Sequence, residues 1–211
     1  GNDQSWGVLS AQSYQETVER LYNGMHSQLF AADKTLMEAG NREKMIRRIA
    51  ELTQLSENYV LECWQPGDNR PPKLLWGFDL NRIIELSRTS FMAGLISEAT
   101  AWKNILQSSA YIHALFDDLD DYYNNFRLGH AYWSNDFKLT GEKLKGHKAY
   151  NNDCDWPIKT MAWHKNEPGI LPEVIQNACE EFVALETRKY KHNVIRGFRP
   201  GNNDDDIHAP E

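Results

Sequence analysis

Cysteine, proline and long apolar runs are all scarce in this chain of 211 residues. It has three cysteines and eight prolines, and no two cysteines form a Cys-x-x-Cys pair. This excludes a disulfide-dense mini-domain and favours a protein of a reducing compartment. Because no run reaches about 18 apolar residues, we expect no transmembrane helix. The sequence also shows no basic and then apolar leader, and we therefore expect a cytoplasmic location.

Basic side chains are fewer than acidic ones. The chain has 23 basic and 30 acidic side chains, which gives a formal net charge of −7. Non-specific binding of nucleic acid needs a basic face, so this balance argues against that class of function. We expect no nucleic acid and no membrane among the partners. The negative charge suits a protein partner, which would be basic.

Apolar and aromatic side chains are well represented. Hydrophobic residues make up 41% of the chain and aromatic residues 11%, with seven tryptophans. A chain of this length buries roughly two-thirds of its unfolded surface. These values exclude a disordered chain and predict a globular domain with a substantial core.

The first 63 residues are predicted to form an N-terminal helical hairpin. Apolar residues recur there at the three- and four-residue spacing of a helix face. The two runs comprise Val18, Leu21, Tyr22, Met25 and Leu29, and then Met45, Ile49, Leu52 and Tyr59. Gly40-Asn41 separates the runs. Residues 64–73 hold three prolines and a glycine, and they are predicted to form a loop.

Residues 74–198 are predicted to form a helical core domain. Three helices come first, with Ser97 and either Asp117 or Asp118 as N-caps, and Gly129 inside the third allows close packing. An irregular region that contains Trp156 and Trp163 follows, and a last helix begins at Pro172. The acidic tail, 199–211, is predicted to be mobile. We therefore predict an all-α fold, a single helical domain of about six main helices.

Several motifs between positions 74 and 164 resemble the bacterial domain-of-unknown-function family 1266. They are Phe78-Asp79-Leu80-Asn81-Arg82, the stretch from Gly94 to Trp102, Phe116, the stretch from Gly129 to Trp133, Trp156-Pro157 and Trp163. Phe78 stands where the family has a tryptophan. The resemblance implies a bacterial, intracellular, helical protein and brings no established activity.

Asp79 and Arg82 are the first candidate site. They lie three residues apart on one predicted helix face, so they can pair with each other or reach neighbouring helices. Together with Trp102 and Trp133 they could form a polar pocket with aromatic walls, which would suit a small ligand or an enzyme. A partly buried ion pair that fixes helix register explains the same two residues.

Four aspartates, Asp117, Asp118, Asp120 and Asp121, are the second candidate site. Their DDxxD spacing is that of a magnesium–diphosphate site, but the sequence lacks a second metal-binding helix. His113, Asp117 and Asp120 share a spacing suited to a metal, again without further ligands. N-capping and the helix dipole explain the cluster more simply. We expect no metal and no other cofactor.

The sequence favours a non-enzymatic module for protein–protein interaction. It has no Gly-x-Ser-x-Gly motif, and no cysteine has a histidine beside it that sequence would identify as a base. One concrete form is an immunity-type inhibitor that covers a basic partner with the four aspartates. The alternative is a small-ligand binder or enzyme that uses Asp79 and Arg82. The two hypotheses differ in whether a cavity converges on Asp79.

Overall fold

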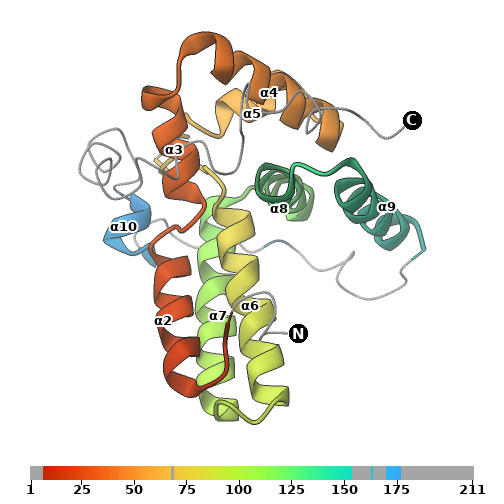
Figure 1. Cartoon of the computed structure of the whole chain (residues 1–211). Coiled ribbons are helices and arrows are strands. Elements are labelled where there is room, and N and C mark those ends of the chain that lie inside the picture. Colours follow the sequence, from red (N-terminus) through yellow and green to blue (C-terminus); the bar gives the residue numbers. More distant parts are fainter. Residues whose placement is uncertain (1–6, 68, 154–162, 164–169, 177–211) are drawn as a thin grey trace.

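The structure is a computed structural model that describes residues 7–67, 69–153, 163 and 170–176 (Figure 1). Within these residues it contains helices and turns and no strand, so the predicted all-α class is confirmed. The helices are α2 (Ala11–Tyr22), α3 (Ser27–Leu36), α4 (Ala39–Thr53), α5 (Glu57–Glu62), α6 (Trp76–Met92), α7 (Glu98–Leu115), α8 (Leu119–Ser134), α9 (Phe137–Asp153) and α10 (Glu173–Gln176).

Helix α6 lies at the centre of the packing. It packs against α7, α8 and α2, while α4 packs against α5, α8 and α9. In Figure 1, α2, α6 and α7 run side by side, and α3, α4 and α5 lie beyond one end of that group. The position of α6 follows from its composition, because Trp76, Phe78, Leu80 and Ile83 are fully buried.

A close approach of α6 and α8 depends on Gly129. A Cβ atom built there would lie 2.3 Å from Phe78 Cβ, so no larger side chain fits without moving one helix. The predicted role of Gly129 in helix packing is thus confirmed.

The predicted helix start at Ser97 is confirmed, and of the two predicted alternatives, Asp117 and Asp118, it is Asp118 that caps α8. Ser97 accepts a hydrogen bond from the Thr100 backbone N–H at the start of α7. Asp118 does the same for Asp121 at the start of α8. Both side chains satisfy backbone donors that a first helical turn leaves without partners. These local signals need no tertiary information, which explains why sequence alone identified them.

The predicted N-terminal hairpin of two helices is wrong, because four helices, α2 to α5, occupy that stretch. The first run breaks at Gly24, which has a φ of +73° and separates α2 from α3. A Cβ there would lie 2.6 Å from Trp76 Cη2, so both the backbone and the packing require glycine. Gly40 and Asn41, the predicted break, instead lie in the first turn of α4.

The region after Asn135 also differs from the prediction. We expected irregular structure there, but Phe137–Asp153 form α9. Only Thr140 and Leu144 are buried on this helix, so it presents no apolar face for periodicity to detect. Trp163, in the region expected to be irregular, is anchored to the helices, since its Nε1 donates to the Phe116 carbonyl at 3.0 Å.

The predicted last helix is confirmed at its beginning. Pro172 precedes α10, and Ile175 of α10 is fully buried. The later part of that helix, Trp156 and the tail 199–211 lie outside the described residues. Cys154 and Cys179 also lie outside them, whereas Cys63 is a buried core thiol.

Replacement of Gly129 by alanine tests the α6–α8 contact. We expect Gly129→Ala to lower the free energy of unfolding by about 1–3 kcal/mol, because overpacking shifts Phe78. Urea denaturation followed by circular dichroism measures this. Gly141→Ala on α9 is the matched control, since a Cβ there meets nothing within 4 Å. It should leave stability unchanged or raise it by about 0.5–1 kcal/mol. Equal effects of the two variants would contradict the packing role.

Candidate functional site

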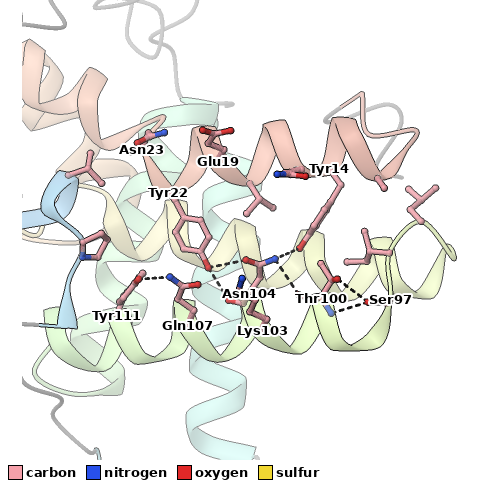
Figure 2. Close-up of a pocket in the computed structure, with 17 residues that line it drawn as sticks. Tyr14, Glu19, Tyr22, Asn23, Ser97, Thr100, Lys103, Asn104, Gln107 and Tyr111 are labelled. Atoms are coloured by element: carbon pink, nitrogen blue, oxygen red, sulfur yellow. Dashed lines mark hydrogen bonds between the residues drawn. The ribbon is translucent and has the colours of Figure 1, made fainter.

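A groove with a volume of about 840 Å³ lies between α2 and α7 (Figure 2). The two helices supply its walls, and α10 lies at the end opposite Ser97. Apolar side chains line part of it, among them Val18, Ile96 and Val174. The groove is open to solvent, so a ligand could lie along it rather than be enclosed.

The floor of the groove is a chain of hydrogen-bonded hydroxyl and amide groups. Tyr22 donates its hydroxyl to the Asn104 carbonyl at 3.2 Å, and that hydroxyl also lies 3.1 Å from Ser108 Oγ. Asn104 Nδ2 donates to the Tyr14 hydroxyl at 2.9 Å, which lies 2.7 Å from Ser87 Oγ. This network joins α2, α6 and α7 and fixes the shape of the groove.

The chemistry of this lining suits recognition of neutral polar groups. Glu19 and Lys103 are the only carboxylate and ammonium groups among the described lining residues. Burial raises the pKa of Tyr22 to about 12, so its phenol keeps its proton at neutral pH and acts as a donor. Further along α7, Gln107 donates to the Tyr111 hydroxyl. Amides and hydroxyls of this kind pair with amide groups of a ligand.

Asp79 is fully buried and does not pair with Arg82. Its carboxylate accepts hydrogen bonds from the Ser27 backbone N–H at 2.9 Å and from Ser27 Oγ at 2.8 Å. His26 Nδ1 donates to it at 2.6 Å, and the His26 backbone N–H donates as well. The carboxylate thus satisfies the first donors of α3, where a negative charge is favourable. These contacts support a structural role that ties α3 to α6.

Arg82 and Trp133, two of the four candidate pocket residues, lie close together. The guanidinium carbon lies 4.9 Å from the Phe78 ring centroid and 5.6 Å from that of Trp133. Arg82 also pairs with Glu85 at 2.8 Å. Trp133 is 51% exposed. Arginine stacked on aromatic faces in this way is a common recognition element.

Trp102 lies apart from this contact. It stands on α7, is 53% exposed, and its Nε1 donates to Glu98 at 3.3 Å. Of the four residues predicted to share a pocket, Arg82 and Trp133 are the two that the described structure brings together. Asp79 is fully buried and hydrogen-bonded to His26 and Ser27, so it does not open toward them.

The four predicted aspartates do not present one open acidic face. Asp117 pairs with Arg70 at 2.6 Å, and Asp121 pairs with Lys73 at 2.7 Å. The side chain of Asp121 is only 12% exposed. These two aspartates attach the 64–73 loop to the start of α8.

The other two aspartates have separate surroundings. Asp118 caps α8, and Asp120 lies 3.2 Å from His147 Nε2 on α9. In the described part of the chain, no group of three or more His, Cys, Asp or Glu side chains could hold a metal ion. His113 packs instead against the Trp163 ring, with centroids 4.3 Å apart.

Sequence reasoning missed the groove residues. Tyr22 belongs to the predicted apolar run, and the sequence patterns single out neither Tyr14 nor Asn104. A signal was present on α7, where Thr100, Asn104, Gln107 and Tyr111 repeat at helical spacing. The other wall of the groove, however, is α2, which lies about 80 residues earlier in the sequence. Tyr22 and Asn104, which are hydrogen-bonded to each other, are 82 residues apart. Periodicity within one helix could not reveal that pairing.

Asp79→Asn tests the structural role of this carboxylate. The neutral amide keeps one acceptor oxygen but loses the charge-assisted hydrogen bonds to His26 and Ser27. We expect a loss of about 1–3 kcal/mol in the free energy of unfolding. Thermal and urea denaturation measure it, with the exposed Asp153→Asn as control. Unchanged stability of Asp79→Asn would overturn this assignment.

The burial of His130 predicts that the stability of the fold depends on pH. It is 4% exposed, and burial, with the charges of Lys143 and Arg82, lowers its pKa from 6.5 to about 4. The unfolded chain binds this proton near pH 6.5, but the folded chain binds it only near pH 4. Stability is therefore complete above pH 6.5 and falls as the pH drops through this window.

Substitution by glutamine isolates this contribution. Between pH 7 and pH 5 the wild type should lose on the order of 1 kcal/mol more than His130→Gln. Urea denaturation at the two pH values provides the comparison. Identical pH slopes for the two proteins would exclude a buried neutral His130.

The chain is similar to an inner membrane protein, YnjI, of Escherichia coli strain K12. The two are 28% identical over 174 residues, which cover 76% of this chain and 49% of that relative. The chain thus spans about half the length of the relative it matches. No solved structure matches it.

The relative corrects the cytoplasmic location expected from the sequence, because its name places it in the inner membrane. That expectation rested on the scarcity of cysteine, the lack of long apolar runs and the lack of a leader. None of these features excludes association with a membrane. In the described residues, none of the helices combines the length and hydrophobicity needed to cross a bilayer.

The family comparison covers most of the chain. A family model described as a protein of unknown function, DUF1266, matches residues 3–163. This confirms the resemblance drawn from residues 74–164 and extends it to the start of the chain. The match includes α2 to α9, and with them both walls of the groove. The chain belongs to the DUF1266 family.

Proposed function

We propose that this chain is a non-enzymatic interaction module of a bacterial protein and that it binds a polypeptide segment of its partner in the α2–α7 groove. The observation that carries the proposal is the lining of that groove. Hydroxyl and amide groups form its floor, and apolar side chains such as Ile96 and Val174 flank them. A polypeptide offers both kinds of surface, namely backbone amides and apolar side chains.

The arrangement of charge supports the same proposal. Glu19 on α2 and Lys103 on α7 face the groove from opposite walls. A bound segment with one side chain of each sign would complement both. The basic partner expected from the net charge of −7 stays a prediction, but the four aspartates are poor candidates to bind it. Arg70 and Lys73 already neutralise two of them.

The membrane-protein relative supports a location for the module. YnjI is named as an inner membrane protein, and a protein that carries this module would accordingly act at a bacterial inner membrane. The match covers about half of that relative. The membrane-spanning part and the interaction module can therefore be separate parts of one protein.

The alternative of an enzyme or ligand binder centred on Asp79 and Arg82 is not retained. The Asp79 carboxylate is fully buried, and its hydrogen bonds go to His26 and Ser27. A catalytic or binding carboxylate must be able to reach a ligand. In this fold the carboxylate holds a helix instead.

Selection of binding peptides tests the proposal. Random 12-residue peptides displayed on phage would be selected against the whole folded chain, and the enriched peptides measured by fluorescence polarisation. Gln15 lines the groove and is exposed, so Gln15→Trp should fill the groove without disturbing the core. We expect it to weaken peptide binding at least tenfold, about 1.4 kcal/mol.

Gln12→Trp is the matched control. Gln12 is exposed on the same helix but does not line the groove, so this variant should bind peptides as the wild type does. No enrichment, or equal binding by Gln15→Trp and the wild type, would refute the groove as the interaction site.

A further inference from the structure

A second pocket, with a volume of about 440 Å³, lies between α8 and α9. Its lining combines aromatic and basic side chains from both helices. They include Tyr123, Phe126, Arg127, Lys143, His147 and Tyr150. The volume is within the range of about 300–1,000 Å³ that is typical of small-molecule sites. None of these residues takes part in the α2–α7 groove.

Arg127 is the unusual member of this pocket. It is only 6% exposed, yet its guanidinium donates only to neutral acceptors. These are the Thr53 carbonyl at 3.1 Å, Asn124 Oδ1 at 3.2 Å and His147 Nδ1 at 3.3 Å. No carboxylate among the described residues forms an ion pair with it. A buried charge is normally paired, because removal from water is costly.

Further positive charge converges on the same region. Lys143 Nζ lies 5.7 Å from the centroid of the Phe126 ring. Arg127 and Lys143 are the two cations of the pocket lining. Opposing them are Glu142, which lines the pocket, and Asp120, which contacts His147 from outside it. The two cations Arg127 and Lys143 outnumber the one carboxylate in the lining.

The aromatic residues give the pocket flat walls. The rings of Tyr123 and His147 lie 4.6 Å apart between centroids at 31°, and those of Tyr123 and Tyr150 lie 6.4 Å apart. Phe126 forms another wall beneath Lys143. Such faces favour a planar ring in a ligand. Guanidinium and ammonium groups favour phosphate, with the planar guanidinium able to donate two parallel hydrogen bonds.

We propose that the α8–α9 pocket binds a phosphate-bearing ligand with a planar ring, of the mononucleotide class. The phosphate contacts Arg127 and Lys143, and the ring packs against Tyr123, Phe126 or Tyr150. The ligand supplies the ion pair that Arg127 lacks among the described residues; the Asp120 carboxylate acts on Arg127 without forming one. A mononucleotide fits both features of the site, whereas inorganic phosphate uses only one.

Isothermal titration of the whole chain with AMP, GMP, CMP and UMP tests the proposal at about 50 mM salt, where charge contacts are weakly screened. Inorganic phosphate and adenosine are the partial probes. We expect at least one mononucleotide to bind with a Kd below 1 mM (about −4 kcal/mol). Each partial probe should bind at least about tenfold more weakly. If inorganic phosphate bound as tightly as every mononucleotide, the proposed role of the aromatic walls would be overturned.

Two lysine variants distinguish specific binding in the pocket from general attraction of the ligand to positive charge. Lys143→Gln removes an exposed cation that lines the pocket, and Lys145→Gln removes an exposed cation on the same helix outside it. Lys143→Gln should weaken mononucleotide binding at least about fivefold, and Lys145→Gln less than about twofold. Equal weakening by both, or no mononucleotide binding by the wild type, would overturn the proposal.

The role of Arg127 in binding must be tested separately from its structural role. Its hydrogen bond to the Thr53 carbonyl joins α8 to the end of α4, so a variant could unfold. Arg127→Lys keeps the charge but loses the planar donor pair. If it remains folded by circular dichroism, mononucleotide affinity should fall while the adenosine titration stays unchanged. Gln15→Trp should leave mononucleotide binding unaltered, which makes failure at this pocket distinguishable from failure at the groove.

Discussion

The buried carboxylate of Asp79 is the interaction on which much of this fold depends. It lies on the central helix α6 and holds the first turn of α3 through His26 and Ser27. A buried ionised group is tolerated only when hydrogen bonds replace its water, and here four donor atoms do so. The direction of the chain after α2 is therefore set by a contact about 50 residues away in sequence, at a separation of 53 for His26.

Helix α6 connects this contact to both proposed sites. On one side it meets α2 and α7, where Tyr14 reaches Ser87 and contributes to the floor of the groove. On another it meets α8 through Gly129 and Phe78. Helix α8 then carries Arg127 into the pocket that it shares with α9. The two sites use different faces of the bundle, so a partner segment and a small ligand could be bound independently.

The chain belongs to the DUF1266 family and is similar to part of an inner membrane protein. The match covers about half of YnjI, and no described helix of this chain is long and apolar enough to cross a membrane. Composition correctly indicated a globular domain, but it did not indicate the inner-membrane location that the name of the relative carries.

Sequence alone was enough to predict the all-α class, the cap at Ser97, a second cap at Asp117 or Asp118 and the loop around Pro66, because each depends on local backbone chemistry. Tertiary packing accounts for the need for glycine at position 129, which comes from Phe78 on another helix. It also accounts for the binding of Asp79 to His26 rather than Arg82, for the attachment of Asp117 and Asp121 to a distant loop, and for helix α9. Those outcomes depend on which helices meet, and a residue's spacing along one helix does not specify its neighbours on another.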